Sequence, residues 1–230
     1  MVVVVSKLVI VGAGETAEIA YEYFLHDSPY EPVAFAVENR YRKTEEQFGL
    51  PVIDLESMTE RYPPENFTAY VAVSYTFLNR VRRRLFLMVK EAGYTCASYI
   101  SSNAFVWPNA AIGENCFVFE NNSIQHHASI ADNTTVWSGS VIAHRAEIGA
   151  HSFIASGAVI NGFCRVGESC FFGARACLGD TLSIAEDSII GMGAAVIRSI
   201  ETPGGVYVGN PARRLKDSSY VAFSVPEELQ

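Results

Sequence analysis

The second half of the chain repeats every six residues. Written in sixes from Ala104, the third position holds a large apolar residue in all sixteen hexads, from Val106 to Val196. The first position is Ala, Ser, Thr or Cys in fourteen of them, and Gly or Ala follows the apolar residue in ten. A period of six fits neither an α-helix nor an alternating strand. It predicts a repeat architecture, in which successive units stack into one continuous core.

We interpret the repeat as a triangular parallel β-helix, in which each hexapeptide forms one flat face and eighteen residues make one circuit. The apolar residue fills the inside, the small residue lies where the walls meet, and Gly or Ala after the apolar residue suits a sharp corner. Residues eighteen apart should then stack on consecutive coils. Two adjacent outer columns follow, the first His126, His144, Gly162 and Asp180, the second His127, Arg145, Phe163 and Thr181.

Residues 1–100 alternate between strand and helix patterns. Strands are predicted at 2–11, 33–37, 68–73 and 96–100, and helices at 16–25, 55–61 and 79–92. This βαβ order predicts a small parallel sheet with right-handed crossovers.

A glycine turn of the form GxGxxA, from Gly12 to Ala17, follows the first strand and opens the first helix. In that context the glycines let backbone N–H groups approach a phosphate at the helix N-terminus. Glu38, about twenty residues on, suits ribose recognition. The motif alone leaves open an NAD site and a plain tight turn. Among four arginines near the start of the third helix, Arg82 is the candidate to approach a pyrophosphate, the alternative being an ordinary solvated surface.

The formal charge of −8 argues against a nucleic-acid surface, which is normally basic. The apolar start has no basic leader, and Lys7 interrupts it, so we expect a buried strand and not a signal peptide. No run is long enough to span a bilayer, and we expect a cytoplasmic protein without a membrane partner. The five cysteines are odd in number and lack metal-finger spacing, which predicts reduced, buried thiols.

An α/β half, hexapeptide coils and the closing segment Gly205-Val-Tyr-Val-Gly-Asn-Pro-Ala-Arg213 together resemble bacterial sugar acetyltransferases of the NeuD/PglD type. The resemblance implies an N-terminal Rossmann-like domain followed by a left-handed parallel β-helix. It assigns residues 1–100 to nucleotide-sugar binding, 101–215 to the acetyltransferase β-helix and 216–230 to a C-terminal tail. Such enzymes move an acetyl group from acetyl-CoA to a sugar that is commonly nucleotide-linked. A homotrimer, CoA between subunits, no metal, and a place in surface-polysaccharide (lipopolysaccharide) or glycan-precursor synthesis are implied with it.

The resemblance also implies roles for individual residues. His144 matches the catalytic histidine, with Gly162 as its matching glycine. Arg145 and Trp137 stand where the family has an acid and an asparagine, so what orients His144 is left open. Asn39 is a further departure, at the second place of an acidic pair. The implied CoA-binding residues are Ala174, Met192, Gly193 and Arg213, and the implied sugar-binding residues are Gly12, Gly14, Glu15, Thr16, Glu38, Asn39, Ser74, Tyr75 and Arg82.

Acetyl transfer from a thioester needs a proton acceptor and polarisation of the carbonyl. A neutral His144 imidazole can take the proton, and the Gly162 N–H can stabilise the oxyanion. The plainer alternatives are an exposed corner histidine and a glycine chosen for its backbone conformation. An alcohol needs a base more than an amine does, and the acid that would orient His144 is missing. We therefore predict N-acetylation of a nucleotide-linked amino sugar, with O-acetylation next.

Two rival functions remain, a γ-class carbonic anhydrase and a non-catalytic nucleotide-sugar-binding scaffold. The hydrase site resembles two zinc-binding histidines five residues apart, with a third on a neighbouring coil. Here His144 and His151 are seven apart, which argues against it. The sugar, its nucleotide and the acetylated carbon are not determined by the sequence.

Overall fold

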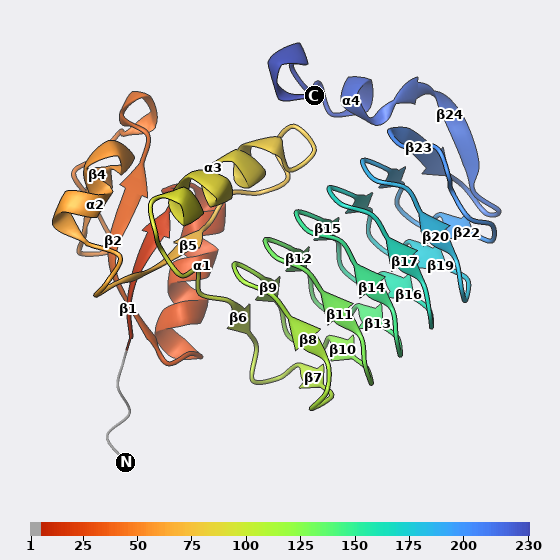
Figure 1. Cartoon of the computed structure of the whole chain (residues 1–230), viewed down its shortest axis with the longest axis horizontal. Helices are drawn as coiled ribbons and strands as arrows, with labels where there is room; N and C mark the ends of the chain where they lie inside the picture. Colours follow the sequence, from red (N-terminus) through yellow and green to blue (C-terminus); the bar gives the residue numbers. More distant parts are fainter. Residues whose placement is uncertain (1–5) are drawn as a thin grey trace. The chain divides into compact units, whose positions relative to one another are not determined.

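The structure is a computed structural model of the chain, in which residues 6–230 are described (Figure 1). The chain divides into two compact units. The first comprises described residues up to 74 together with 82–99, and the second comprises 75–81 and 100–230. The beginning of the strand predicted at 2–11 lies outside the described residues.

The first unit is built on a five-stranded sheet with the order β3-β4-β2-β1-β5. Neighbouring strands are parallel except β3, which runs antiparallel to β4. Apolar runs such as Leu8–Val11 are buried on both faces, as parallel strands require. The strands are β1 (Ser6–Val11), β2 (Tyr30–Val37), β3 (Glu46–Gln47), β4 (Leu50–Asp54) and β5 (Thr68–Val71), and the helices are α1 (Glu15–His26), η1 (Asn39–Tyr41), η2 (Leu55–Ser57), α2 (Met58–Arg61) and α3 (Arg80–Glu91).

Two features of the first unit differ from the prediction. The β3–β4 hairpin was not predicted, because Pro51 interrupts its short apolar run and reads as a loop. The strand predicted at 96–100 is reduced to an isolated bridge between Cys96 and Ala69, followed by β6 (Tyr99–Ile100), where the chain passes into the second unit. The remaining predicted strands and helices are present with shifted ends.

Sixteen two-residue strands form the coils of the second unit, and each ends on an apolar third position of the repeat (Figure 1). The hexapeptide prediction is therefore confirmed as a β-helix. The strands are β7 (Phe105–Val106), β8 (Ala111–Ile112), β9 (Phe117–Val118), β10 (Ser123–Ile124), β11 (Ser129–Ile130), β12 (Thr135–Val136), β13 (Val141–Ile142), β14 (Glu147–Ile148), β15 (Phe153–Ile154), β16 (Val159–Ile160), β17 (Arg165–Val166), β18 (Phe171–Phe172), β19 (Cys177–Leu178), β20 (Ser183–Ile184), β21 (Ile189–Ile190) and β22 (Ala195–Val196).

The coil strands stack into three parallel sheets. The first sheet has the order β22-β19-β16-β13-β10-β7 and the second β20-β17-β14-β11-β8. The third has the order β24-β23-β21-β18-β15-β12-β9-β6, in which β24 is antiparallel to its neighbour β23. Each strand pairs with residues eighteen positions away, as Ile124 does with Ile142 and Ile142 with Ile160. Those three side chains are fully buried in the interior, which confirms the predicted stacking.

The small first position of the hexad carries a hydrogen-bond ladder. Ser140 Oγ donates to Ala155 O at 3.1 Å, and Cys164 Sγ donates to Gly179 O at 2.9 Å, each fifteen residues along the chain. The Ser140 hydroxyl also accepts from the backbone N–H eighteen residues on, at Ala158. The Ser140 hydroxyl is thus tolerated inside the coil because both of its hydrogen-bonding capacities are used.

The glycines after the apolar residue do not form the sharp corners that the sequence suggested. Gly149 and Gly167 are not left-handed, and a Cβ on Gly149 would lie 2.5 Å from the Gly167 carbonyl carbon. Small size is needed because the backbone of the next coil passes there. The left-handed corners come two residues later, at Arg145 (φ 57°) and Phe163 (φ 59°), where the chain accepts the strain of a non-glycine residue.

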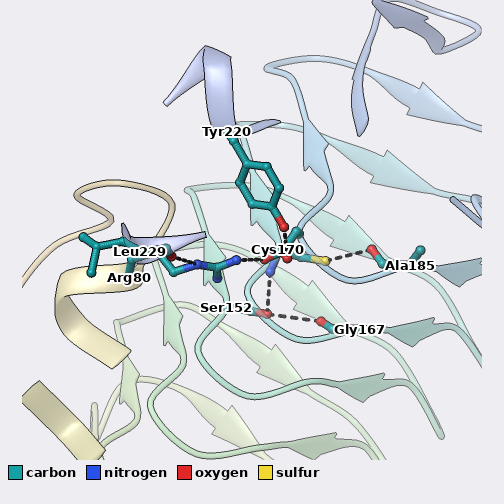
Figure 2. Close-up of polar contacts among 8 residues, drawn as sticks. Arg80, Ser152, Gly167, Cys170, Ala185, Tyr220 and Leu229 are labelled. Atoms are coloured by element: carbon teal, nitrogen blue, oxygen red, sulfur yellow. Dashed lines mark hydrogen bonds and ion pairs between the residues drawn. The ribbon is translucent and has the colours of Figure 1, made fainter. Parts of the chain in front are cut away.

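The C-terminal segment packs on the third coil sheet, where Leu78, Ile189, Val206 and Val225 form one apolar cluster. Asp187 lies beside this cluster. Its carboxylate accepts from Arg80 Nη2 and from the Tyr220 hydroxyl, each at 2.6 Å. Figure 2 labels these two donors, Arg80 and Tyr220. This segment contains β23 (Gly205–Val208), β24 (Arg213–Ser218), α4 (Ser219–Ala222) and η3 (Glu227–Leu229).

Within residues 6–230 no helix is long and apolar enough to cross a membrane.

Candidate functional site

His144 and Gly162 are brought together as the eighteen-residue stacking predicts. A Cβ on Gly162 would lie 2.5 Å from His144 Cε1 and 2.6 Å from His144 Nε2. The imidazole therefore lies directly over the Gly162 α-carbon. Gly162 is not left-handed, so the alternative of a glycine chosen for backbone conformation is wrong, and room for the ring is the physical reason for this glycine.

The Gly162 N–H is engaged in the structure. It donates to Asp180 Oδ1 at 3.0 Å, and Asp180 is the next member of the same column. An oxyanion can therefore use this N–H only if the Asp180 carboxylate, which is exposed, moves away. The sequence analysis placed Asp180 in this column but gave it no role. Its position eighteen residues after Gly162 was the signal that its carboxylate could accept from the Gly162 N–H.

Packing and not a carboxylate holds the His144 ring. Its ring stands edge-on to Phe163, with centroids 5.2 Å apart and an interplanar angle of 88°. Its backbone N–H donates to Gln125 Oε1 at 3.2 Å. Among the described residues no group hydrogen-bonds either ring nitrogen, so both nitrogens of this exposed side chain can face other molecules.

His126 lies one coil before His144 in the same column. Its ring contacts that of His127 edge-on at 4.2 Å, and Asn109 Nδ2 lies 3.2 Å from its Nδ1. Partial desolvation, followed by the charges of His127, Arg145 and His144, holds the pKa of His126 below its ordinary 6.5. His126 is thus biased toward the neutral form.

The predicted CoA residues lie at a different corner. Met192 lies over Gly173, nineteen residues before it, where a Cβ would lie 2.5 Å from Met192 N. The Met192 side chain is 80% exposed. The Gly193 N–H donates to Ala174 O at 2.9 Å. This corner follows the third coil sheet, whereas His144 follows the first. One chain therefore does not bring Ala174, Met192 and Gly193 to His144. The fourth predicted CoA residue, Arg213, is exposed on β24.

The predicted sugar-nucleotide loops of the first unit share one edge of its sheet. Gly12 follows β1, Glu38 follows β2 and Ser74 follows β5, and these three parallel strands are neighbours. The carboxyl ends of parallel strands are where such sheets bind ligands. A Cβ on Gly12 (φ 128°) would lie 2.7 Å from Ala72 O, so only glycine fits there.

Backbone donors are available at the start of α1. Gly14 is its N-cap, and the N–H groups of Gly14, Glu15 and Thr16 bond to nothing else in residues 6–230. The Gly12 N–H is not available, because it donates to Ala36 O at 2.8 Å. The predicted anion site therefore consists of the helix start and excludes the first glycine.

Other predicted sugar-binding side chains are engaged in packing or ion pairs. Glu38 accepts from Arg84 Nη2 at 2.7 Å and from Arg40 Nη2 at 3.3 Å, while Asn39 next to it is exposed. Arg82 is 2% exposed, with its guanidinium 6.0 Å from the Tyr70 ring centroid, so it is not a solvated surface residue.

Tyr75 belongs to the second unit. Its ring packs against Phe153 at 4.8 Å and Phe171 at 5.1 Å, which are outward side chains of the third coil sheet. Only the exposed part of the Tyr75 side chain is therefore available to contact a sugar.

Comparisons with known proteins support the hexapeptide fold of the second unit. The family described as bacterial transferase hexapeptide (six repeats) matches residues 109–144 and 127–162. The acetyltransferase domain of PglB from Neisseria gonorrhoeae is 27% identical, with a TM-score of 0.80, and the match covers 91% of this chain and 98% of that one. The chain resembles the NeuD/PglD-type sugar acetyltransferases.

Two further solved structures share the fold. PerB from Caulobacter crescentus is 24% identical with a TM-score of 0.80, covering 92% of this chain and 98% of that one. WeeI from Acinetobacter baumannii is 23% identical with a TM-score of 0.77, covering 91% and 100%. No curated protein sequence matches the chain. The left-handed β-helix that the family resemblance implied is the fold that these comparisons support.

Proposed function

We propose that this protein is an acetyl-CoA-dependent N-acetyltransferase acting on a nucleotide-linked amino sugar. The observation that carries the proposal is the exposed His144 ring lying on Gly162, with both nitrogens accessible at a corner of hexapeptide coils. The similar acetyltransferase domain of PglB was solved in complex with acetyl coenzyme A, and PerB with CoA and GDP-perosamine. An acyl transfer at this corner accounts for both the coils and the histidine.

The chemistry follows from an imidazole acting as general base. The amine nitrogen of the sugar attacks the thioester carbonyl carbon, and His144 takes the proton that the amine loses. The carbon–sulfur bond then breaks, the amide forms, and the proton passes to the departing CoA thiolate. An alcohol is a weaker nucleophile that depends more on a base oriented by an acid, and the described chain offers His144 no such acid, so an amine is the favoured acceptor.

CoA binding is proposed to need a second copy of the chain. Ala174, Met192 and Gly193 lie at the corner after the third coil sheet, whereas His144 lies at the corner after the first. A neighbouring subunit must therefore supply one of the two corners. The first coil sheet presents small apolar side chains outward, such as Val141, Val159 and Ala195, with the half-exposed Phe105 and Trp107 at one end. Such a surface supports self-association, and we propose a homotrimer.

The first unit is proposed to be the Rossmann-like nucleotide-sugar domain. Its support is the run of free N–H groups at the start of α1, next to the ends of β2 and β5, which suits a pyrophosphate. A place in surface-polysaccharide or glycan-precursor synthesis, and location in the cytoplasm, stay predictions from the sequence.

The test is a thiol-release assay with acetyl-CoA and a panel of UDP-, GDP- and dTDP-linked amino sugars. We expect CoA release that depends on one class of amino sugar and saturates with it. A protein that binds a nucleotide sugar, shown by thermal shift, yet releases no CoA with any panel member would be a binding scaffold, contrary to the proposal. Sedimentation of the full chain tests the trimer separately.

A further inference from the structure

A hollow of about 410 Å³ lies beside the His144 corner and is lined by two arginines and an aromatic ring. Its residues form a regular grid over three successive coils, with one corner residue and one strand residue from each. The strand column is fixed by the register Glu147↔Arg165 and Arg165↔Ser183. Since parallel strands lie about 4.8 Å apart, three coils span about 10 Å, the scale of a substituted monosaccharide. The lining residues are Arg145, Glu147, Phe163, Arg165, Thr181 and Ser183.

Phe163 connects this hollow with His144. Its ring is 51% exposed, and it stands edge-on to the His144 ring at 5.2 Å. A sugar whose apolar face lies on Phe163 is therefore placed next to the imidazole, because aromatic rings line most sites that hold small ligands. The hydroxyls of Thr181 and Ser183 on the next coil can bond ring hydroxyls.

The charges in the hollow favour an anion, although the whole chain carries −8. In the described chain the Arg145 guanidinium has neither a hydrogen bond nor an ion pair. Arg165 Nε lies 3.7 Å from Glu147 Oε2, and both side chains are well exposed, which leaves the terminal nitrogens of Arg165 available. A planar guanidinium with free N–H groups matches a carboxylate in a paired, two-bond geometry.

We propose that this hollow binds a carboxylate of the acceptor sugar, so that the substrate class is an acidic amino sugar of the aminouronic type. The inference rests on the proposed function, because it takes the hollow to be the acceptor side of the His144 site. Arg145 and Arg165 hold the carboxylate, Phe163 supports the ring, and the amine is turned toward His144.

The experiment is a ligand-observed NMR titration of the full chain with three probes, D-glucuronate, D-glucose and D-glucose 6-phosphate. We expect glucuronate to bind at least about tenfold more tightly than glucose, as charge-assisted hydrogen bonds allow. Arg165→Met and Arg145→Met should each reduce that preference, and Phe163→Ala should weaken both sugars alike. Arg61→Met, an exposed arginine on α2, is the matched control and should keep the preference.

Three results would overturn the proposal. Glucose and glucuronate could bind equally or not at all, the preference could survive both arginine substitutions, or glucose 6-phosphate could bind more tightly than glucuronate, which would make the hollow a phosphate site. The titration needs no acetyl transfer, so it separates this proposal from the proposed function. Acetyl transfer to neutral amino sugars with a kcat/KM as high as that for acidic ones would refute the acidic substrate alone. Preferential binding of glucuronate without any acetyl transfer would refute only the proposed transferase activity.

Discussion

Gly162→Ala is the substitution that tests most sharply how this chain holds its histidine. The added methyl would lie 2.5 Å from His144 Cε1, 2.6 Å from Nε2 and 3.1 Å from Nδ1. Carbon atoms in contact prefer separations of about 3.5 Å or more, so the ring must move by about 1 Å. The ring is exposed and free of hydrogen bonds, so it can swing outward without disturbing the coil.

The expected effect is therefore on catalysis and not on stability. A displacement of about 1 Å at a catalytic group costs on the order of 100-fold in rate, and we expect a loss of that size in kcat. The melting temperature should stay near that of the wild type, because the interior side chains are unchanged and the Gly162 N–H can still donate to Asp180. The assay is acetyl transfer at saturating acetyl-CoA, with thermal unfolding measured on the same samples.

Gly179→Ala provides the control, since a Cβ there meets nothing nearer than 3.6 Å. It should keep both kcat and the melting temperature. A Gly162→Ala protein with wild-type kcat would refute the idea that packing on Gly162 positions the ring. A large fall in melting temperature would show instead that the coil backbone, and not the ring, needs this glycine.

Three further outcomes are expected. His144→Asn should lower kcat by about 10²- to 10⁴-fold, the usual contribution of a general base, and leave acetyl-CoA binding nearly unchanged by calorimetry; a variant retaining most of its kcat removes His144 from the mechanism. Asp187→Asn should cost about 3–5 kcal/mol in the free energy of unfolding, measured in urea, because Arg80 keeps a largely buried charge without its partner; an unchanged urea midpoint contradicts the clamp. Burial, and then the Glu65 charge, raises the pKa of Tyr94 from 10.0 to about 12 in the folded chain, so its contribution to stability is full below pH 10 and lost as the pH rises through 12. Tyr94→Phe should flatten the fall of stability between those pH values, and an equal fall in both proteins would refute this.

The coil could be predicted almost residue by residue, because its physics is local and periodic. Each apolar third position, such as Ile142, must point inward, and each stacks on its neighbour eighteen residues on. The same periodicity predicts that His144 stacks against Gly162, as it does in the structure. What it could not reveal was the reason for the corner glycines, because the distance between successive backbones depends on how the coils close.

Contacts between distant segments were beyond the sequence. Nothing in the pattern indicated that Arg80 would meet Asp187, more than a hundred residues away, or that Phe77, Leu78 and Asn79 would be left-handed in succession. Such residues keep strained backbone angles only because buried neighbours fix them. The engagement of the Gly162 N–H by Asp180 was hidden for a similar reason, since a repeat gives columns and not the directions of side chains.

The most direct test of the proposed function is to follow the acetyl group itself. The full chain is incubated with isotope-labelled acetyl-CoA and the active nucleotide amino sugar, and the sugar is analysed by mass spectrometry before and after mild alkali. We predict label on the sugar that resists alkali, as an amide does, and its loss with His144→Asn. Label removed by alkali would identify an ester and contradict N-acetylation, and label absent from the sugar would contradict acetyl transfer altogether.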